Sequence, residues 1–82
     1  MIVDSHVHIF PPDFLRERQS LLRLDKTFNE LYSNSQSKLV TADQLIKVMD
    51  ENEIDVSVVM SIGWTSSELS EKSNQYIAES CL

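Results

Sequence analysis

Residues 1–10 read MIVDSHVHIF, a mostly apolar run that carries two histidines two positions apart. Its β-branched and other apolar residues are typical of a β-strand. Two prolines follow directly and end such a strand, because proline cannot donate a hydrogen bond to a neighbouring strand. We therefore predict a strand over residues 2–9 that contains both His6 and His8.

The two histidines are expected to share one face of this strand, because successive side chains alternate between its faces. The even-numbered residues from 2 to 8, which include Asp4, form that face, and the mostly apolar odd-numbered residues from 3 to 9 form the other. Burying a polar group without a partner costs about 1–3 kcal/mol. A divalent metal ion would satisfy both His6 and His8, because neutral imidazoles are common metal ligands and this spacing lets them converge on one ion. The alternative is a pair of ordinary, hydrogen-bonded histidines.

The rest of the chain alternates helical and strand-like segments. We predict a long loop with short helices over 11–38, a helix over 41–53, a strand over 55–62 and a helix over 66–82. Thr41 followed by Gln44 is typical of a capping box, and the apolar residues after it recur at helical spacing. Residues 55–62 are so continuously apolar that they indicate a strand of a parallel sheet that is covered on both faces.

This order of elements predicts an α/β fold in which parallel strands are joined by right-handed crossover helices. With 82 residues, the chain is one small domain with a modest core. His6 and His8 come at the carboxyl end of the first predicted strand, which is where α/β barrels build their active sites. The sequence therefore predicts a metal site at that end of a parallel sheet.

Composition and charge argue against several classes of partner. The net charge is −6 and no basic cluster occurs, which disfavours binding to nucleic acid or to an anionic membrane surface. No apolar run approaches the roughly 20 residues of a membrane span, and no stretch resembles a signal peptide. Cys81 is the only cysteine, so no internal disulfide is expected and a reducing compartment is favoured. We expect a cytoplasmic protein.

Three stretches of the sequence resemble one enzyme family. Residues 3–14, VDSHVHIFPPDF, resemble the D-x-H-x-H opening of the amidohydrolase superfamily, in particular its amidohydrolase-related (amidohydrolase-2) branch, which includes aminocarboxymuconate-semialdehyde decarboxylase-like enzymes. Residues 42–62 are similar to the family's first barrel helix and second strand, and residues 73–79 to the segment that introduces its next helix. Polymerase-and-histidinol-phosphatase domains and TatD-type nucleases share the opening motif, but the proline-rich continuation favours the amidohydrolase-2 branch.

The resemblance implies the N-terminal β-α-β-α portion of a (β/α)8 TIM barrel. His6 and His8 match the family's first two ligands of a divalent metal ion, with zinc preferred and manganese as the alternative. Asp4 matches the leading acid of the motif, which we expect to orient a ligand rather than to bind the ion. The family's other ligands and its catalytic aspartate come from later strands, and a complete barrel takes about 250 residues. We therefore expect an incomplete barrel that contributes no catalytic acid or base.

The implied activity is metal-dependent hydrolysis of C–N or C–O bonds, or decarboxylation, of a small carboxylated or cyclic substrate. The isolated chain is expected to be inactive and to work as a homo-oligomer or with a complementing barrel fragment. A non-catalytic binding or assembly module is the alternative. Trp64, which follows the second strand, is a candidate for stacking on a cyclic substrate, with packing at the rim as the alternative. One arginine of the first loop is a candidate for pairing with a substrate carboxylate, and a solvated helix face is the favoured alternative for all three: Arg16, Arg18 and Arg23.

Overall fold

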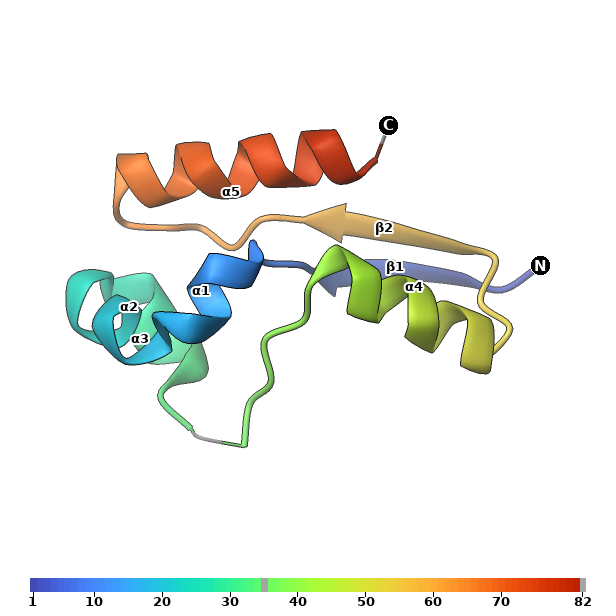
Figure 1. Cartoon of the computed structure of the whole chain (residues 1–82), viewed down its shortest axis with the longest axis horizontal. Helices are drawn as coiled ribbons and strands as arrows, with labels where there is room; N and C mark the ends of the chain where they lie inside the picture. Colours follow the sequence, from blue (N-terminus) through green and yellow to red (C-terminus); the bar gives the residue numbers. More distant parts are fainter. Residues whose placement is uncertain (35, 82) are drawn as a thin grey trace.

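The two strands in the described part of the chain form a parallel sheet. The computed structural model describes residues 1–34 and 36–81. In chain order, its elements are β1 (Val3–His8), α1 (Pro12–Arg16), α2 (Arg18–Leu24), α3 (Lys26–Tyr32), α4 (Ala42–Glu51), β2 (Val56–Met60) and α5 (Ser67–Ser80) (Figure 1). The crossover from β1 to β2 includes α4. The helix predicted over 66–82 reaches Leu82, and the loop predicted over 11–38 includes Ser35; both residues lie outside the described part of the chain.

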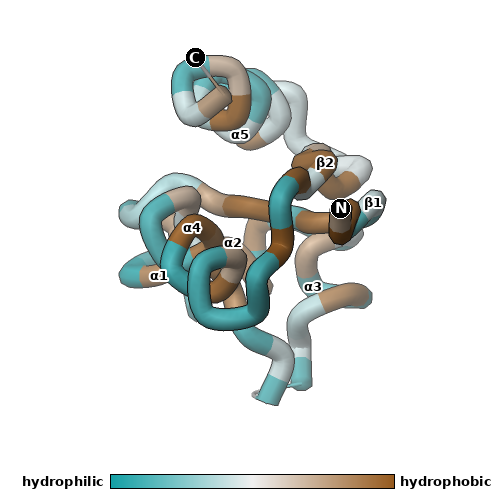
Figure 2. Tube along the Cα trace, turned by 90° about the vertical axis from the view of Figure 1, so that its right-hand side faces the viewer, coloured by the Kyte–Doolittle hydropathy of each residue, from teal (hydrophilic) through white to brown (hydrophobic). Residues whose placement is uncertain are grey.

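Helices α4 and α5 lie on one side of the strands, as the view from the end of the sheet shows (Figure 2). A cavity of about 180 Å³ separates them from the sheet. Its lining includes Ser57 and Val59 of β2, Leu45 and Met49 of α4, and Ser80 at the end of α5. These two residues of β2 therefore face the helices.

Local hydrogen bonds set where the helices begin. The capping box predicted at the start of α4 is confirmed: the N–H of Gln44 donates to Oγ1 of Thr41 at 3.3 Å, and the N–H of Thr41 donates to the Gln44 side-chain oxygen at 2.9 Å. Ser66 caps α5 with a hydroxyl that accepts a backbone N–H from the first turn. α4 ends at Glu51, earlier than predicted, because Glu53 has a φ of 54°, a left-handed conformation that does not continue a right-handed helix.

The hydrophobic core lies beyond the carboxyl ends of the strands, where α1, α2 and α3 gather (Figure 1). Its buried residues come from these short helices and from the segments that follow β1, α3 and β2: Phe10, Phe14, Leu21, Phe28, Leu39, Ile62 and Trp64. α4, in contrast, contains no buried residue. The long segment after the first strand therefore supplies much of the core.

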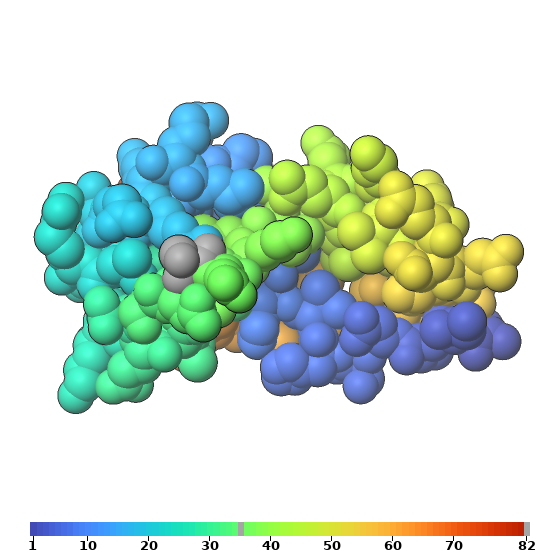
Figure 3. Space-filling view, turned by 90° about the horizontal axis from the view of Figure 1, so that it is seen from below, coloured from blue at the N-terminus to red at the C-terminus, as the bar shows by residue number. Residues whose placement is uncertain are grey.

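The sheet is covered on one face only, which corrects the expectation that residues 55–62 are covered on both faces. Val56 and Val58 are 43% and 46% exposed. Their neighbours Ser57 and Val59 face the cavity beside α4. The atoms of β1, dark blue in the space-filling view, also lie at the surface along one side of the molecule (Figure 3). Although the sequence of β2 is continuously apolar, one face of this strand is therefore partly exposed to solvent.

The pairing of the two strands contains one irregularity. Residues 4–7 of β1 lie opposite residues 57–59 of β2, so three steps along one strand match two steps along the other. Because of this extra residue, side chains do not alternate strictly between the two faces over residues 4–7. The expectation that Asp4 shares a face with the two histidines depended on that alternation. Beyond it the pairing continues, with His8 opposite Met60.

None of the described helices has the length and apolar character that a membrane crossing requires. The longest, α5, has 14 residues. Its surface carries charged side chains, among them Glu68 and Lys72, whose carboxylate oxygen and Nζ lie 3.5 Å apart one turn along the helix. Such exposed pairs add little to stability, typically less than about 1 kcal/mol.

Candidate metal centre

His6 and His8 bring their ring nitrogens together at one side of β1. Their Nε2 atoms lie 3.2 Å apart, and the rings meet edge-to-face, with centroids 4.8 Å apart and an interplanar angle of 84°. The two residues are two positions apart on β1, and their Nε2 atoms meet on one side of the strand. His6 is exposed and His8 is half-buried, which leaves the pair accessible from solvent.

The spacing of the two nitrogens fits a shared zinc ion. Two nitrogens that each lie about 2.0–2.1 Å from a tetrahedral zinc ion are about 3.3–3.4 Å apart. The observed Nε2–Nε2 distance of 3.2 Å is close to that value. Imidazole nitrogens favour zinc over manganese, which prefers oxygen ligands. The donor set therefore suits the preferred metal of the two.

The second strand orients the ring of His8. Its Nδ1 lies 2.9 Å from the carbonyl oxygen of Met60 on β2. A carbonyl oxygen only accepts hydrogen bonds, so Nδ1 carries the proton and a neutral His8 presents a free lone pair on Nε2. Metal-binding histidines commonly donate their other ring N–H to a carbonyl or carboxylate, because this fixes the tautomer and the ring orientation. His8 therefore has the orientation and tautomer of a metal ligand.

A hydrogen bond between the two rings accounts for the same geometry without a metal. In that arrangement, Nε2–H of His6 donates to the lone pair on Nε2 of His8 across the same 3.2 Å. The two alternatives make opposite demands on His6, because metal binding requires a free lone pair on Nε2 and the hydrogen bond requires a proton there. Measuring metal binding directly distinguishes them.

In the described part of the chain, no third ligand joins the two imidazoles. Among the residues that the structure describes, no group of three or more His, Cys, Asp or Glu side chains is placed to hold a metal ion. The carboxylate of Asp4, expected to orient a ligand, instead accepts a hydrogen bond from the backbone N–H of His6 at 3.3 Å. Asp4 thus contacts the backbone of the strand rather than a ring. The pair supplies two of the three or four protein ligands that zinc sites use.

Trp64 is part of the hydrophobic core. The residue is 9% exposed and stacks on Phe28, with ring centroids 5.3 Å apart and an interplanar angle of 5°. Phe10 and Phe14 meet the indole edge-to-face. Its Nε1 is buried without a hydrogen-bond partner in the described part of the chain. This burial agrees with the packing alternative, and stacking on a substrate would require the aromatic cluster to open.

The arginines of the first loop make contacts within that loop. The guanidinium of Arg18 donates to the carbonyl oxygens of Tyr32 at 3.0 Å and Asn34 at 2.9 Å, which ties α2 to the end of α3. Arg16 forms an exposed ion pair with its neighbour Asp13. Arg23 is exposed. The contacts of Arg16 and Arg18 are thus structural ones, and a role for any of the three in substrate binding stays a prediction.

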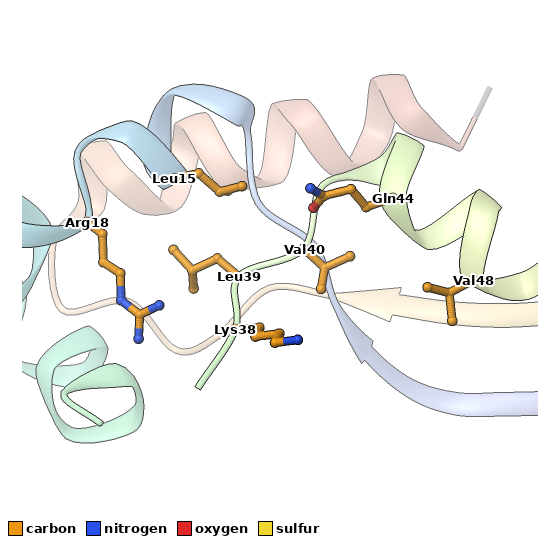
Figure 4. Close-up of a pocket in the computed structure, with 7 residues that line it drawn as sticks. All are labelled: Leu15, Arg18, Lys38, Leu39, Val40, Gln44 and Val48. Atoms are coloured by element: carbon orange, nitrogen blue, oxygen red, sulfur yellow. The ribbon is translucent and has the colours of Figure 1, made fainter. Parts of the chain in front are cut away.

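A surface cavity of about 450 Å³ lies between α1, α2 and α4 (Figure 4). Its lining combines apolar side chains with two cations and one amide: Leu15, Arg18, Lys38, Leu39, Val40, Gln44 and Val48. This lining includes neither histidine of the candidate metal centre. The cavity and the histidine pair are therefore separate features of the surface.

One buried carboxylate was not predicted from the sequence. Asp25 is 1% exposed, and its two oxygens accept the backbone N–H groups of Phe28 at 3.0 Å and Ser66 at 2.8 Å. Burial raises the pKa of this carboxyl, but hydrogen bonds from the backbone of Phe28, Ser66, Thr65 and Thr27 outweigh burial and hold the pKa below its usual value. Asp25 directly precedes α3, and this position is typical of a residue that caps a helix, which accounts for the bond from Phe28. Nothing near Asp25 in the sequence indicates the bond from Ser66.

Comparisons with known proteins leave the family open. No protein-family model, curated protein or solved structure matches this chain. The resemblance of residues 3–14 to the amidohydrolase superfamily, and the (β/α)8 barrel that it implies, therefore stay predictions.

Proposed function

We propose that the chain provides the first two strands and the first two metal ligands of a metal-dependent hydrolase or decarboxylase of the amidohydrolase type, with a small carboxylated or cyclic substrate. The observation that carries the proposal is the histidine pair: the Nε2 atoms of His6 and His8 lie 3.2 Å apart, while β2 holds Nδ1 of His8. The parallel pairing of β1 with β2 around a crossover helix supports it, because (β/α)8 barrels repeat that unit.

The chain's own residues would hold and orient the ion. When bound, a divalent metal would polarise a substrate carbonyl or carboxylate, or lower the pKa of a bound water. His8 presents Nε2 in the tautomer that its hydrogen bond to Met60 sets. His6 completes the pair from the exposed side, and the bond from its backbone N–H to Asp4 restrains the strand there. Since the described residues add no further acid or base to the pair, we expect the isolated chain to be inactive.

A non-catalytic assembly module is the second candidate. The exposed Val56 and Val58, together with the open edges of a sheet that has only two strands in the described chain, favour it, because unpaired strands and apolar faces promote association. In that case the sheet binds a protein partner without any metal. For both candidates we place the protein in the cytoplasm, since its lone exposed thiol, Cys81, suits a reducing compartment.

Zinc retention by the purified chain tests the metal site. After loading with zinc and dialysis against metal-free buffer, the wild-type chain should retain zinc, measured by inductively coupled plasma mass spectrometry. His6→Ala and His8→Ala should lose it. Ser5→Ala is the matched control, because Ser5 lies on the same strand, is exposed and carries no imidazole. A wild-type chain that retains no more zinc than His6→Ala would contradict the metal site and favour the assembly module.

A further inference from the structure

We infer that two copies of this chain share one zinc ion, held by His6 and His8 of each copy in a site of four imidazoles. The inference rests on the metal-binding histidine pair of the proposed function. Four imidazoles leave no open position for a substrate, so the shared ion would have a structural role in the isolated, inactive chain, and the partner is a second copy of the same chain.

The number of ligands on one chain calls for a partner. Structural zinc sites use four protein ligands, and catalytic sites use three. The described residues provide His6 and His8 but no third side chain that joins them. A second copy related by a two-fold axis adds the same pair, because such contacts bring identical residues together. Two pairs of nitrogens, each pair 3.2 Å apart, then match the edges of one tetrahedron.

The face that carries the histidines is open and apolar. In the sheet, His8 pairs with Met60, the last residue of β2. Because side chains alternate along a strand, Met60, Val58 and Val56 lie on the same face. The alternate residues, Ser57 and Val59, face the cavity beside α4. The two valines therefore lie on the side of the histidines, where they are 43% and 46% exposed. A second copy would cover them.

Charge makes this association depend on the metal. Each copy has a net charge of −6, so two copies repel one another. Two half-exposed valines per copy form only a small apolar patch, whereas stable interfaces bury about 1,200–2,000 Å² in total. The zinc ion supplies the attraction and the positive charge that the patch lacks. The dimer should therefore form with zinc and dissociate when a chelator removes it.

Sedimentation velocity of the purified chain, residues 1–82, tests the inference. In EDTA we expect a monomer. With zinc chloride at half an equivalent per chain we expect a dimer, and mass spectrometry of the isolated dimer should give one zinc per two chains. X-ray absorption at the zinc edge should show four imidazole nitrogens. His6→Ala should remain a monomer with zinc present.

Two lysine substitutions separate the shared face from general surface effects. Val58→Lys places a positive charge on the histidine face and should prevent the dimer, although both imidazoles remain. Val48→Lys is its matched control, because Val48 is 45% exposed but lies on α4 beside a different cavity, and this variant should dimerise as the wild type does. Circular dichroism spectra that match the wild type establish that both variants fold.

The outcomes distinguish this inference from the proposed function. A monomer that holds one zinc ion per chain would overturn the shared site and leave the metal site of the proposed function intact. A chain that binds no zinc would overturn both. A dimer that persists in EDTA, or one that Val48→Lys disrupts as strongly as Val58→Lys, would also overturn the shared site.

Discussion

The Nδ1 atom of His8 on β1 lies 2.9 Å from the carbonyl oxygen of Met60 on β2. This bond makes the orientation of a candidate metal ligand depend on the pairing of the two strands. In the described structure, the ring of His6 forms a hydrogen bond only to His8. The pair as a whole is therefore oriented from the second strand.

Replacing His8 by asparagine should separate its two functions. The side-chain nitrogen of asparagine lies near the position of Nδ1 and can donate to Met60, but nothing replaces Nε2. We expect His8→Asn to lose zinc retention with little loss of stability. His8→Ala should lose zinc retention and also about 1 kcal/mol of unfolding free energy, the net value of one hydrogen bond. Urea unfolding followed by circular dichroism measures this, and equal destabilisation by both variants would show that the Met60 bond contributes nothing.

Stability should depend on pH through Asp25. The pKa of this carboxyl in the folded chain is below its usual value of 3.8, so folding favours the ionised form. The resulting stabilisation is present above pH 3.8 and is lost as the pH falls below it towards the folded-state pKa. In urea unfolding between about pH 5 and pH 3, the free energy of unfolding of Asp25→Asn should therefore fall less steeply than that of the wild type.

At neutral pH the same variant should already be less stable. Asparagine has a single acceptor oxygen, so one of the two N–H groups of Phe28 and Ser66 loses its partner, at a cost of about 1–3 kcal/mol. Asp50→Asn is the matched control, because Asp50 is an exposed acid on α4. If both variants changed the pH dependence equally, overall charge rather than Asp25 would be responsible.

The two substitutions of Trp64 should differ sharply. Trp64→Ala should cost about 3–5 kcal/mol, a large part of the about 4–12 kcal/mol expected for a domain of this size. Trp64→Phe should cost much less, because an aromatic ring can still stack on Phe28 and the unpartnered buried Nε1 is removed. Thermal unfolding followed by circular dichroism compares them. A phenylalanine variant as unstable as the alanine variant would contradict this account of the core.

Removing the side chain of Arg18 should loosen the attachment of α3 to α2. Arg18→Ala leaves the carbonyl oxygens of Tyr32 and Asn34 without their charged donor, and we expect a loss of about 1–2 kcal/mol in the free energy of unfolding. Arg23→Ala is the matched control, since Arg23 is an exposed arginine on the same helix. Zinc retention should be unchanged in both variants. Zinc loss in Arg18→Ala alone would show that this helix supports the histidine pair.

Features that depend on neighbours along the chain could be predicted from the amino-acid sequence. The capping box joins Thr41 to Gln44, and the histidine pair joins His6 to His8. In each case, residues at most three positions apart are brought together by the conformation of the backbone between them. The parallel arrangement of the strands was predicted from the order of the elements, since a helix between two strands allows the chain to return to the same end of the sheet.

Only the tertiary structure decided what joins or covers distant segments. The bond between Asp25 and Ser66 spans 41 positions, and the burial of Trp64 depends on rings that α1 and α3 provide. The extra residue within 4–7 appears only in the register of one strand against the other. The exposure of Val58 also depends on the tertiary structure, because its strand is as apolar in sequence as a strand that is covered on both faces. The residue types of a segment determine which secondary structure it favours. Burial and long-range hydrogen bonds depend on which other segments come into contact with it.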